Sequence, residues 1–521
     1  MRARASNPIL PGFYPDPSVC RVGKDYYLVN STFAYFPGVP IFHSRDLVHW
    51  RQIGNVLDRM EQIDLTGTKH SGGIYAPTIR YHKGTFYLIT TNIPTGGNFI
   101  VTAKDPAGPW SDPVFLGSDG IDPSLFFDED GKCYYTGTKD RRENHRYFGD
   151  NEIYVQELDL STLKLVGESY PIWHGALREA VWPEGPHLYK RFGRYYLLIA
   201  EGGTGHEHAV TIARGTSLKE PFVGNPCNPI LTHRHLGQDY PIVNVGHGDL
   251  VETQNGETYM VVLASRPYGG YYRNLGRETF LVPVAWENGW PVVNRGIGLV
   301  ESTVELPNLP KFTVDPVPER EDFDSDKLPY HFLYLRNPNR ANYSLSDRKG
   351  YLRMKLAPER LTELVSPSYV GIRQTSMSYQ LETRMEFTPG SDKEEAGLVL
   401  LQSNQYHYRF VCTLQNGKRT MILVRCFEGK EEVVKEVACE NPKTDEPGIL
   451  LRITAREQLL QFSYSLDGKN YIPVKSGVDS RMLSTDIAGG FVGTTFGLYC
   501  SSNGQASNRY ADFDYLECKN R

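Results

Sequence analysis

The feature that most constrains the fold of this chain is a unit repeated five times within residues 1–265. Each copy has a key residue followed by Pro or Gly, then an apolar run, a turn with Gly and a Tyr-rich strand. The copies read DPSVCRVGKDYYLV from Asp16, APTIRYHKGTFYLI from Ala76, DPSLFFDEDGKCYYTG from Asp122, EGPHLYKRFGRYYLLI from Glu184 and HGDLVETQNGETYMVV from His247. The key positions are 60, 46, 62 and 63 residues apart. A hairpin repeated at this spacing predicts radial, propeller-type assembly, with the first strand of each blade lining a central channel.

Equivalent positions in different blades converge on one axis, so the key residues are expected to face one another. Asp16, Asp122, Glu184 and His247 would meet there, with Ala76 leaving space among them. Three carboxylates gathered in this way resist joint ionisation, which is costly unless they do chemistry. The pattern therefore predicts an enzyme.

The remainder of the chain predicts a second domain, as 521 residues are too many for one ordinary core. The repeats occupy residues 1–305, and segment 306–328, rich in proline and charge, is expected to be a linker. Residues 329–521 contain several short strand patterns separated by turns, typical of an antiparallel β-sandwich. The whole protein is expected to be all-β.

Composition excludes several classes of function. The net charge of -5 gives no basic stripe for binding nucleic acid. The sequence contains no run of 18 apolar residues, so we expect no membrane-spanning helix. The N-terminal segment MRARASNPILPGF lacks an apolar signal region, and the eight cysteines contain no CxxC pair. We therefore expect a cytoplasmic protein with free, mostly buried thiols. Its 12% aromatic content suits a sugar ligand, whose C–H faces pack on rings.

The three carboxylates match the needs of an inverting glycosidase. That reaction requires a carboxylic acid to protonate the leaving oxygen and a carboxylate, about 6.5–9.5 Å away, to activate water. We assign Asp16 as the general base and Glu184 as the general acid, since Glu184 lies in the apolar context VWPEGPHLY. Asp122 would raise the pKa of Glu184 through its charge.

Other interpretations of the same residues exist. A single Asp-Pro at the start of a strand is usually a turn signal, although its recurrence at one repeat position argues against that reading. A non-catalytic propeller that captures sugar or binds protein is a second alternative. The chain has no Trp-Asp dipeptide, which argues against a WD40 array.

Several longer motifs carry a family resemblance that runs from residue 7 to the C-terminus. They are NPILPGFYPDPS, STFAYFPGVPIFHSRDLVHW, SGGIYAP, GIDPSLFFDEDGK, EGPHLYKR, AEGGTGHEH, GHGDLVETQNG and NLGRETF. Together they resemble glycoside hydrolase family 43, in particular its two-domain β-xylosidases and α-L-arabinofuranosidases. The resemblance implies a five-bladed β-propeller, a sandwich of the concanavalin-like jelly-roll type, and inversion of configuration. It places the base, pKa modulator and acid on Asp16, Asp122 and Glu184.

The resemblance also implies a set of substrate-binding residues. Phe33 resembles a ring beside the terminal sugar, and Arg277 an arginine that contacts sugar hydroxyls and the base. Thr204 resembles a lining residue, and Phe496 an aromatic that reaches across from the second domain. Tyr75 departs from the xylosidase pattern, because many relatives carry Trp there. This departure leaves the choice between xylose and arabinose open.

The expected chemistry requires no cofactor, and the resemblance leaves the question of a metal open. His247 resembles a histidine that, in some relatives, helps to hold calcium through water near the axis. Asp322, Asp324 and Asp514 could bind a structural Ca²⁺, as in similar domains, although no D-x-D-x-D-G loop is present.

These observations lead to one expected activity and its rival. We expect an exo-acting, inverting glycoside hydrolase that releases terminal β-D-xylose from xylo-oligosaccharides. The alternative is an α-L-arabinofuranosidase that removes side chains from arabinoxylan, and one pocket could serve both activities. The resemblance further implies a homo-oligomer.

Overall fold

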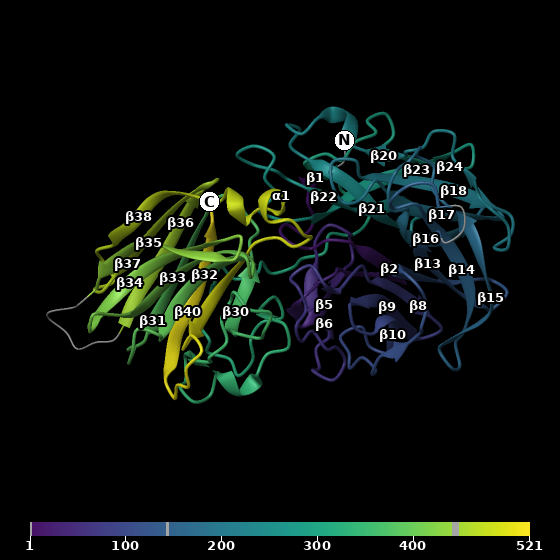
Figure 1. Ribbon diagram of the computed structural model, residues 1–521. Helices are drawn as coiled ribbons and strands as arrows, with labels where there is room; N and C mark the ends of the chain where they lie inside the picture. The colour runs from purple at the N-terminus through teal and green to yellow at the C-terminus, as the bar shows by residue number, and fades with distance from the viewer. Residues whose placement is uncertain (1–2, 142–144, 440–447) are drawn as a thin grey trace.

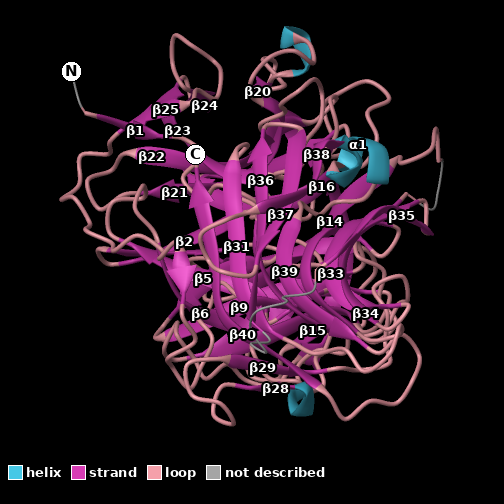
Figure 2. Cartoon of the chain, turned by 90° about the vertical axis from the view of Figure 1, so that its left-hand side faces the viewer, coloured by secondary structure: helices cyan, strands magenta, loops and turns pink. Residues whose placement is uncertain are grey.

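A computed structural model describes residues 3–141, 145–439 and 448–521 of the chain. It confirms the all-β prediction: a five-bladed β-propeller is followed by a concanavalin-like β-sandwich (Figures 1 and 2). Helix in the described residues is limited to α1 (Thr485–Ala488) and to 3₁₀ turns at Arg234–Leu236, Arg340–Asn342 and Arg481–Leu483. None of the helices in this part of the chain is long and apolar enough to cross a membrane.

The propeller consists of five antiparallel sheets, one for each repeat. The first blade contains β2 (Ser18–Val22), β3 (Asp25–Val29), β5 (Gly38–Ser44) and β6 (Arg51–Leu57). The second contains β7 (Gly73–Ile74), β8 (Thr78–His82), β9 (Thr85–Ile93), β10 (Gly97–Ala103) and β11 (Val114–Phe115). The third contains β12 (Ile121–Phe127), β13 (Cys133–Asp140), β14 (Asn151–Asp159) and β15 (Lys164–Trp173). The fourth contains β16 (Glu184–Arg191), β17 (Arg194–Glu201), β18 (Ala209–Gly215), β19 (Val223–Gly224) and β20 (Leu231–Thr232). The fifth contains β21 (Val243–Glu252), β22 (Thr258–Ser265), β23 (Glu278–Glu287) and β24 (Trp290–Val293).

The innermost strands of the blades form a closed ring. Strand β2 contacts β8, β8 contacts β12, β12 contacts β16, β16 contacts β21, and β21 returns to β2. Each of these strands contains its key residue or begins two residues after it, so the repeat pattern correctly indicated which strands line the axis. The N-terminal β1 (Arg4–Ser6) pairs with β25 (Thr303–Glu305), which joins the two ends of the propeller segment.

A buried carboxylate, Asp249, connects the innermost strands of several blades by hydrogen bonds. Asp249 on β21 accepts hydrogen bonds from Ser18 Oγ (2.8 Å), Arg80 Nη1 (2.9 Å) and Tyr189 Oη (2.6 Å). These partners come from the first, second and fourth blades. Because a buried charge must be paired and hydrogen-bonded to be tolerated, this network links four blades through one residue.

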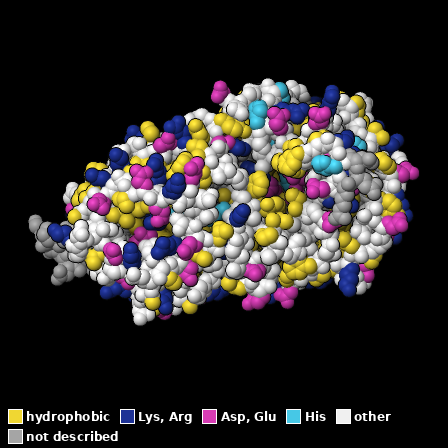
Figure 3. Space-filling model, in the orientation of Figure 1, with side chains coloured by type: hydrophobic (Ala, Val, Ile, Leu, Met, Phe, Trp, Pro, Cys, Tyr) yellow, Lys and Arg dark blue, Asp and Glu magenta, His cyan; other side chains and the backbone are white. Residues whose placement is uncertain are grey.

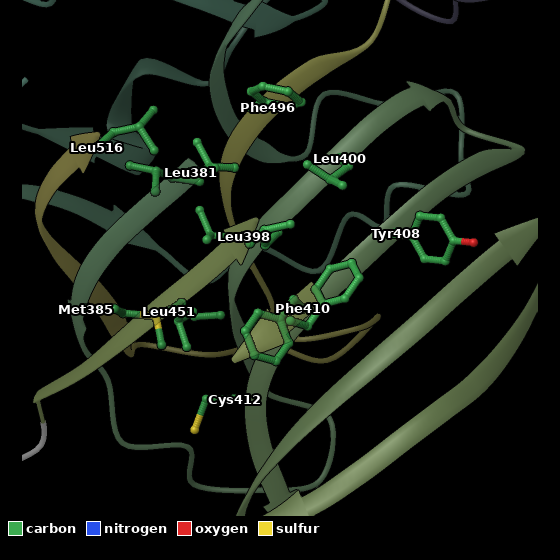
Figure 4. Packing of buried hydrophobic residues seen from close by; sticks show 14 of the residues in the cluster. Leu381, Met385, Leu398, Leu400, Tyr408, Phe410, Cys412, Leu451, Phe496 and Leu516 are labelled. Carbon is green, nitrogen blue, oxygen red and sulfur yellow. The ribbon is translucent and has the colours of Figure 1, made fainter. Parts of the chain in front are cut away.

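The sandwich consists of two sheets packed face to face. One sheet has the order β28 (Tyr343–Ser344), β29 (Leu352–Lys355), β40 (Tyr510–Asn520), β31 (Tyr379–Glu386), β36 (Gly448–Arg456), β37 (Leu459–Ser465) and β38 (Ile472–Asp479). The other has the order β35 (Lys430–Ala438), β34 (Lys418–Phe427), β33 (Tyr406–Gln415), β32 (Glu395–Ser403), β39 (Thr495–Ser501), β30 (Ser368–Arg373), β27 (Leu333–Leu335) and β4 (Tyr35–Phe36). Alternating inward side chains fill the space between the sheets with a large apolar core (Figure 4).

Two short strands show how the domains are joined. Strand β4 comes from the first blade, yet it pairs with β27 and forms the edge of a sandwich sheet, with Tyr35 opposite Leu335. Strand β26 (Arg320–Glu321), inside the segment expected to be a linker, pairs with β40 of the sandwich. Arg373 Nε of the sandwich also donates to Phe13 O of the propeller (2.7 Å). The sandwich is therefore held directly against the first blade.

Candidate active site

The key residues line a small cavity on the propeller axis. Its volume is about 80 Å³, and eight of the nine site residues predicted from the sequence line it: Asp16, Phe33, Tyr75, Asp122, Glu184, Thr204, His247 and Arg277. Ala76, Ile121, His208 and Phe491 complete its wall. On the face shown in Figure 3, hydrophobic side chains surround a hollow in the propeller half, with acidic side chains inside it.

A shared backbone geometry aims three of the key side chains into the cavity. Asp16, Asp122 and His247 have left-handed φ angles of 52°, 53° and 50°, which non-glycine residues rarely adopt. In β12 and β21 these residues fall where the strand pairing shifts register, so each occupies a β-bulge. Such bulges re-aim a side chain, and strain of this kind is characteristic of functional sites.

Glu184 reaches the cavity from a different backbone position. It pairs directly with Ala200 of β17 and precedes the bulge, as Ile121 does in the third blade. The left-handed residue of the fourth blade is Gly185, with φ 59°. The alignment of Glu184 with Asp16 and Asp122 is therefore off by one residue. Gly185 must lack a side chain, because an added Cβ would lie 2.8 Å from Cε1 of His247.

Asp16 is surrounded by groups that favour its ionised form. Arg277 donates from Nη1 to Oδ1 (2.8 Å) and from Nη2 to Oδ2 (3.4 Å), and Ser31 Oγ donates to Oδ2. Burial alone would raise the pKa of Asp16, but the charge of Arg277, helped by His247 and the Ser31 hydrogen bond, brings the pKa below its ordinary value. Asp16 is therefore a carboxylate near neutral pH.

Glu184 and Asp122 are in the opposite electrostatic situation. Burial raises the pKa of Glu184 well above its ordinary value, and the negative charges of Asp122 and Asp16 raise it further. Burial also raises the pKa of Asp122, against the opposing influence of His247. The two groups interact strongly, so they titrate as a pair that retains a proton to higher pH than an ordinary carboxyl group. One cavity thus combines an ionised base with a protonated acid, which is the arrangement that general acid–base chemistry requires.

Three aromatic rings form one wall of the cavity. The ring of Phe33 lies 5.4 Å from that of Tyr75 and 5.8 Å from that of Phe491, measured between centroids. The guanidinium of Arg277 lies 5.5 Å from the Phe33 centroid, and its Nε donates to Phe491 O (3.3 Å). Tyr75 is anchored by its hydroxyl, which donates to Ser71 O (3.1 Å). Rings beside a charged hydrogen-bond donor suit the apolar and polar faces of a sugar.

The prediction for Phe496 is wrong. This residue lies on β39, fully buried in the sandwich core (Figure 4). Its ring centroid is 4.4 Å from that of Tyr379. The sandwich residue that lines the cavity is Phe491. The signal was in the sequence: Phe491 follows Gly489-Gly490 in a loop, whereas Phe496 stands in the strand pattern TFGLYCS.

His208 is a second residue that sequence reasoning missed. Its Nδ1 lies 2.9 Å from Asn244 O, and its ring packs on Gly246, where an added Cβ would lie 2.4 Å away. Burial lowers the pKa of His208 to about 3, so the ring is neutral. Nδ1 must then carry the proton that it donates to the carbonyl, which leaves Nε2 as an acceptor. Nε2 has no hydrogen-bond partner among the described residues.

The acidic residues of the sandwich do not fit a calcium site. Asp322 accepts from Arg320 Nε (2.6 Å), and Asp514 accepts from Arg384 Nη1 (3.4 Å), so arginines already neutralise two of the three candidates. Across residues 3–141, 145–439 and 448–521, no group of three or more His, Cys, Asp or Glu side chains is arranged to hold a metal. The arrangement of Asp322, Asp324 and Asp514 therefore does not support the expected structural Ca²⁺ site.

Comparisons with known proteins agree with this fold and cavity. Residues 5–291 match glycosyl hydrolases family 43, and residues 320–519 match a beta xylosidase C-terminal concanavalin A-like domain. A xylosidase/arabinosidase of Butyrivibrio fibrisolvens is 50% identical over 518 residues, with 98% of both chains covered. A non-reducing end alpha-L-arabinofuranosidase of Bacteroides ovatus, BoGH43B, is 41% identical, with 98% of this chain and 94% of that protein covered. Among solved structures, a xylan beta-1,4-xylosidase from Bacillus halodurans superposes with a TM-score of 0.92 at 38% identity, with 99% of each chain covered.

The propeller, the sandwich and the acid–base cavity define an enzyme of the glycoside hydrolase class. The matches extend over almost the whole chain rather than over one domain alone. The protein belongs to glycoside hydrolase family 43.

Proposed function

We propose that this enzyme is an exo-acting, inverting glycoside hydrolase that releases terminal β-D-xylose from xylo-oligosaccharides. The observation that carries the proposal is the pairing, in one small cavity, of an ionised Asp16 with a protonated Glu184. The cavity has a volume of only about 80 Å³, which favours a single terminal sugar over a long chain. This size supports attack at a chain end.

The proposed reaction is a single displacement at the anomeric carbon of the terminal sugar. The Glu184 carboxyl group donates its proton to the glycosidic oxygen as the bond between that oxygen and the anomeric carbon breaks. Asp16 accepts a proton from water, whose oxygen forms the new bond on the opposite face of the ring. The products are a free sugar of inverted configuration and a shortened oligosaccharide. Glu184 then regains its proton from solvent and Asp16 loses the one it accepted.

The remaining cavity residues would hold and polarise the sugar. Arg277 keeps Asp16 ionised and can also donate to sugar hydroxyls, while Phe33, Tyr75 and Phe491 pack against the ring. Asp122 keeps the pKa of Glu184 high, so that the acid is protonated at the start of each turnover.

The second candidate activity is that of an α-L-arabinofuranosidase. One observation favours it: the names of the B. fibrisolvens and B. ovatus relatives include arabinose-releasing activities. The family resemblance, which implies Trp at the position of Tyr75 in many xylosidases, points the same way. A xylopyranoside and an arabinofuranoside can present similar hydroxyls to one pocket, so we propose that the enzyme hydrolyses both, with xyloside preferred.

Paired assays test both the preference and the stereochemistry. We expect a higher kcat/KM on an aryl β-D-xylopyranoside than on the matching aryl α-L-arabinofuranoside. We also expect NMR of the first product to show α-xylose before mutarotation. A xyloside kcat/KM far below the arabinoside value would reverse the order of the two activities. Initial release of β-xylose would overturn the inverting mechanism.

A further inference from the structure

We propose that Phe148 and Trp182 form the binding platform for the leaving-group sugar, the unit that departs when the terminal sugar is released. This inference rests on the proposed function and extends it to the part of the substrate outside the cavity. Phe148 is 76% exposed and Trp182 is 38% exposed. Their ring centroids are 5.6 Å apart at an interplanar angle of 77°. Exposed aromatic side chains that lie together next to a ligand cavity can extend its binding surface.

Trp182 is next to two segments that line the cavity, one of which carries Glu184. Trp182 precedes Glu184 by two residues in the chain. Its indole ring packs on Gly203, where an added Cβ would lie 2.9 Å from Cε3. The next residue, Thr204, lines the cavity. From these two links we infer that a sugar attached to the oxygen that Glu184 protonates lies against this ring.

The local backbone holds Trp182 in a fixed and costly conformation. Its φ is 50°, a left-handed value that a bulky residue adopts only when the surroundings enforce it. Trp182 N donates to Gly149 O (2.7 Å), and Gly202 N donates to Val181 O (2.9 Å). An added Cβ on Gly149 would also lie 3.2 Å from the indole Nε1. The segments around Gly149 and Gly202 therefore both hold Trp182, and the exposed indole has a fixed position.

The segment that carries Phe148 is joined to the same structure. Tyr147 Oη donates to Ala180 O (3.0 Å), and Arg146 forms a two-pronged pair with Asp150, with 2.7 Å from Nη2 to Oδ1. Phe148 thus projects from a braced turn next to the segment of Trp182. Two rings meeting nearly at right angles make a corner in which one ring can face the C–H surface of a pyranose while the other contacts its edge.

Substrates that differ only in the leaving group test the platform. β-Xylosyl fluoride carries the terminal sugar but no leaving sugar, whereas xylobiose carries both. For Phe148→Ala, we expect the ratio of kcat/KM on xylobiose to kcat/KM on β-xylosyl fluoride to fall by roughly three- to tenfold, from the loss of one aromatic contact. Trp182→Leu should lower the same ratio, and Trp182→Phe should restore most of it.

Phe192→Ala is the matched control. Phe192 is 61% exposed and also contacts a tryptophan, Trp286, but it lies in the turn after β16, at the opposite end of that strand from Glu184. Its substitution should leave the ratio unchanged.

Each result has a distinct meaning. A wild-type enzyme that hydrolyses neither xylosyl substrate would overturn the proposed function, and with it the sugar named here. A wild-type enzyme active on both, with an unchanged ratio in Phe148→Ala and Trp182→Leu, would overturn the platform alone. An unchanged ratio together with a smaller oligomer by sedimentation would assign these rings to a contact between copies of the chain instead.

Discussion

Arg277 holds Asp16 with both arms of its guanidinium, 2.8 Å from Nη1 to Oδ1 and 3.4 Å from Nη2 to Oδ2. The same side chain contacts Thr204 Oγ1 (3.2 Å) and the Phe491 carbonyl of the sandwich. Arg277 therefore connects Asp16, the proposed general base, with the propeller wall and the second domain. Since a lysine cannot reproduce a bidentate fork, its role should be sensitive to a charge-conserving change.

The first prediction concerns this pair. Because Arg277 lowers the pKa of Asp16, removing its charge in Arg277→Met should raise that pKa, and the acidic limb of the kcat/KM–pH profile should move to higher pH. Arg277→Lys should shift the limb less, and Ser31→Ala, which removes one neutral hydrogen bond, less again. Profiles measured on one aryl xyloside would reveal this order, and an unmoved limb in Arg277→Met would contradict the assignment of Asp16 as the base.

The second prediction concerns the alkaline limb. The charge of Asp122 helps to raise the pKa of Glu184, so Asp122→Asn should lower that pKa. The general acid would then lose its proton at lower pH, and activity should decline at a lower pH than in the wild type. An alkaline limb that stays in place or moves upward would show that the charge of Asp122 does not raise the pKa of the acid.

The third prediction tests Glu184 as the acid. Glu184→Gln should reduce kcat on xylobiose by at least about 10²-fold, the usual contribution of a general acid. The loss should be much smaller for β-xylosyl fluoride, because fluoride departs without needing a full proton. Equal losses on both substrates would indicate that Glu184 positions the sugar rather than protonating the leaving oxygen.

The fourth prediction concerns the bulge at Gly185. Gly185→Ala combines a left-handed backbone with a clash against the His247 ring at 2.8 Å. Gly193→Ala is a suitable control, because Gly193 has φ 68° but open space around an added Cβ. The control should lose about 1–2 kcal/mol from backbone strain, and Gly185→Ala about 1–3 kcal/mol more from overpacking. Urea denaturation measures both, and equal losses would mean that His247 moves away freely.

The fifth prediction separates two phenylalanines of the sandwich. Phe496→Ala should lower the free energy of unfolding by about 3–5 kcal/mol, because it leaves a cavity in the core. Phe491→Ala should change stability much less but raise KM, because its ring lines the active-site cavity. Denaturation curves and steady-state kinetics on both variants check the contrast. The reverse pattern would show that Phe496 is the ring that reaches the sugar.

The repeat pattern predicted the propeller axis and most of the residues that line it, because the first strand of each blade lies next to the axis. It misplaced Glu184 by one residue for a physical reason. The copies DPS and EGPH share their proline, so aligning on Pro17, Pro123 and Pro186 puts Gly185, not Glu184, opposite the aspartates. The left-handed φ values of Asp16, Asp122 and Gly185 agree with this second alignment and show that the bulge, not the carboxylate, is the repeated feature.

The contributions of the second domain were harder to predict. Phe491 and Phe496 are five residues apart in one aromatic-containing segment, and the choice between them depends on where β39 begins. Strand β4 has only two residues, so neither alternation nor composition distinguishes it from a loop. Strand β4 forms only through its tertiary pairing with β27, which local sequence does not encode.

The exchange of Tyr35–Phe36 into the sandwich sheet has an evolutionary consequence. If this propeller were fused to a different second domain, β4 would lose its pairing with β27. The backbone amides and carbonyls of that short segment of the first blade would then be left unpaired. We therefore expect a relative with a different appended domain to differ also in the loop before β5. The β4–β27 pairing thus makes a change of one domain depend on a change in the other.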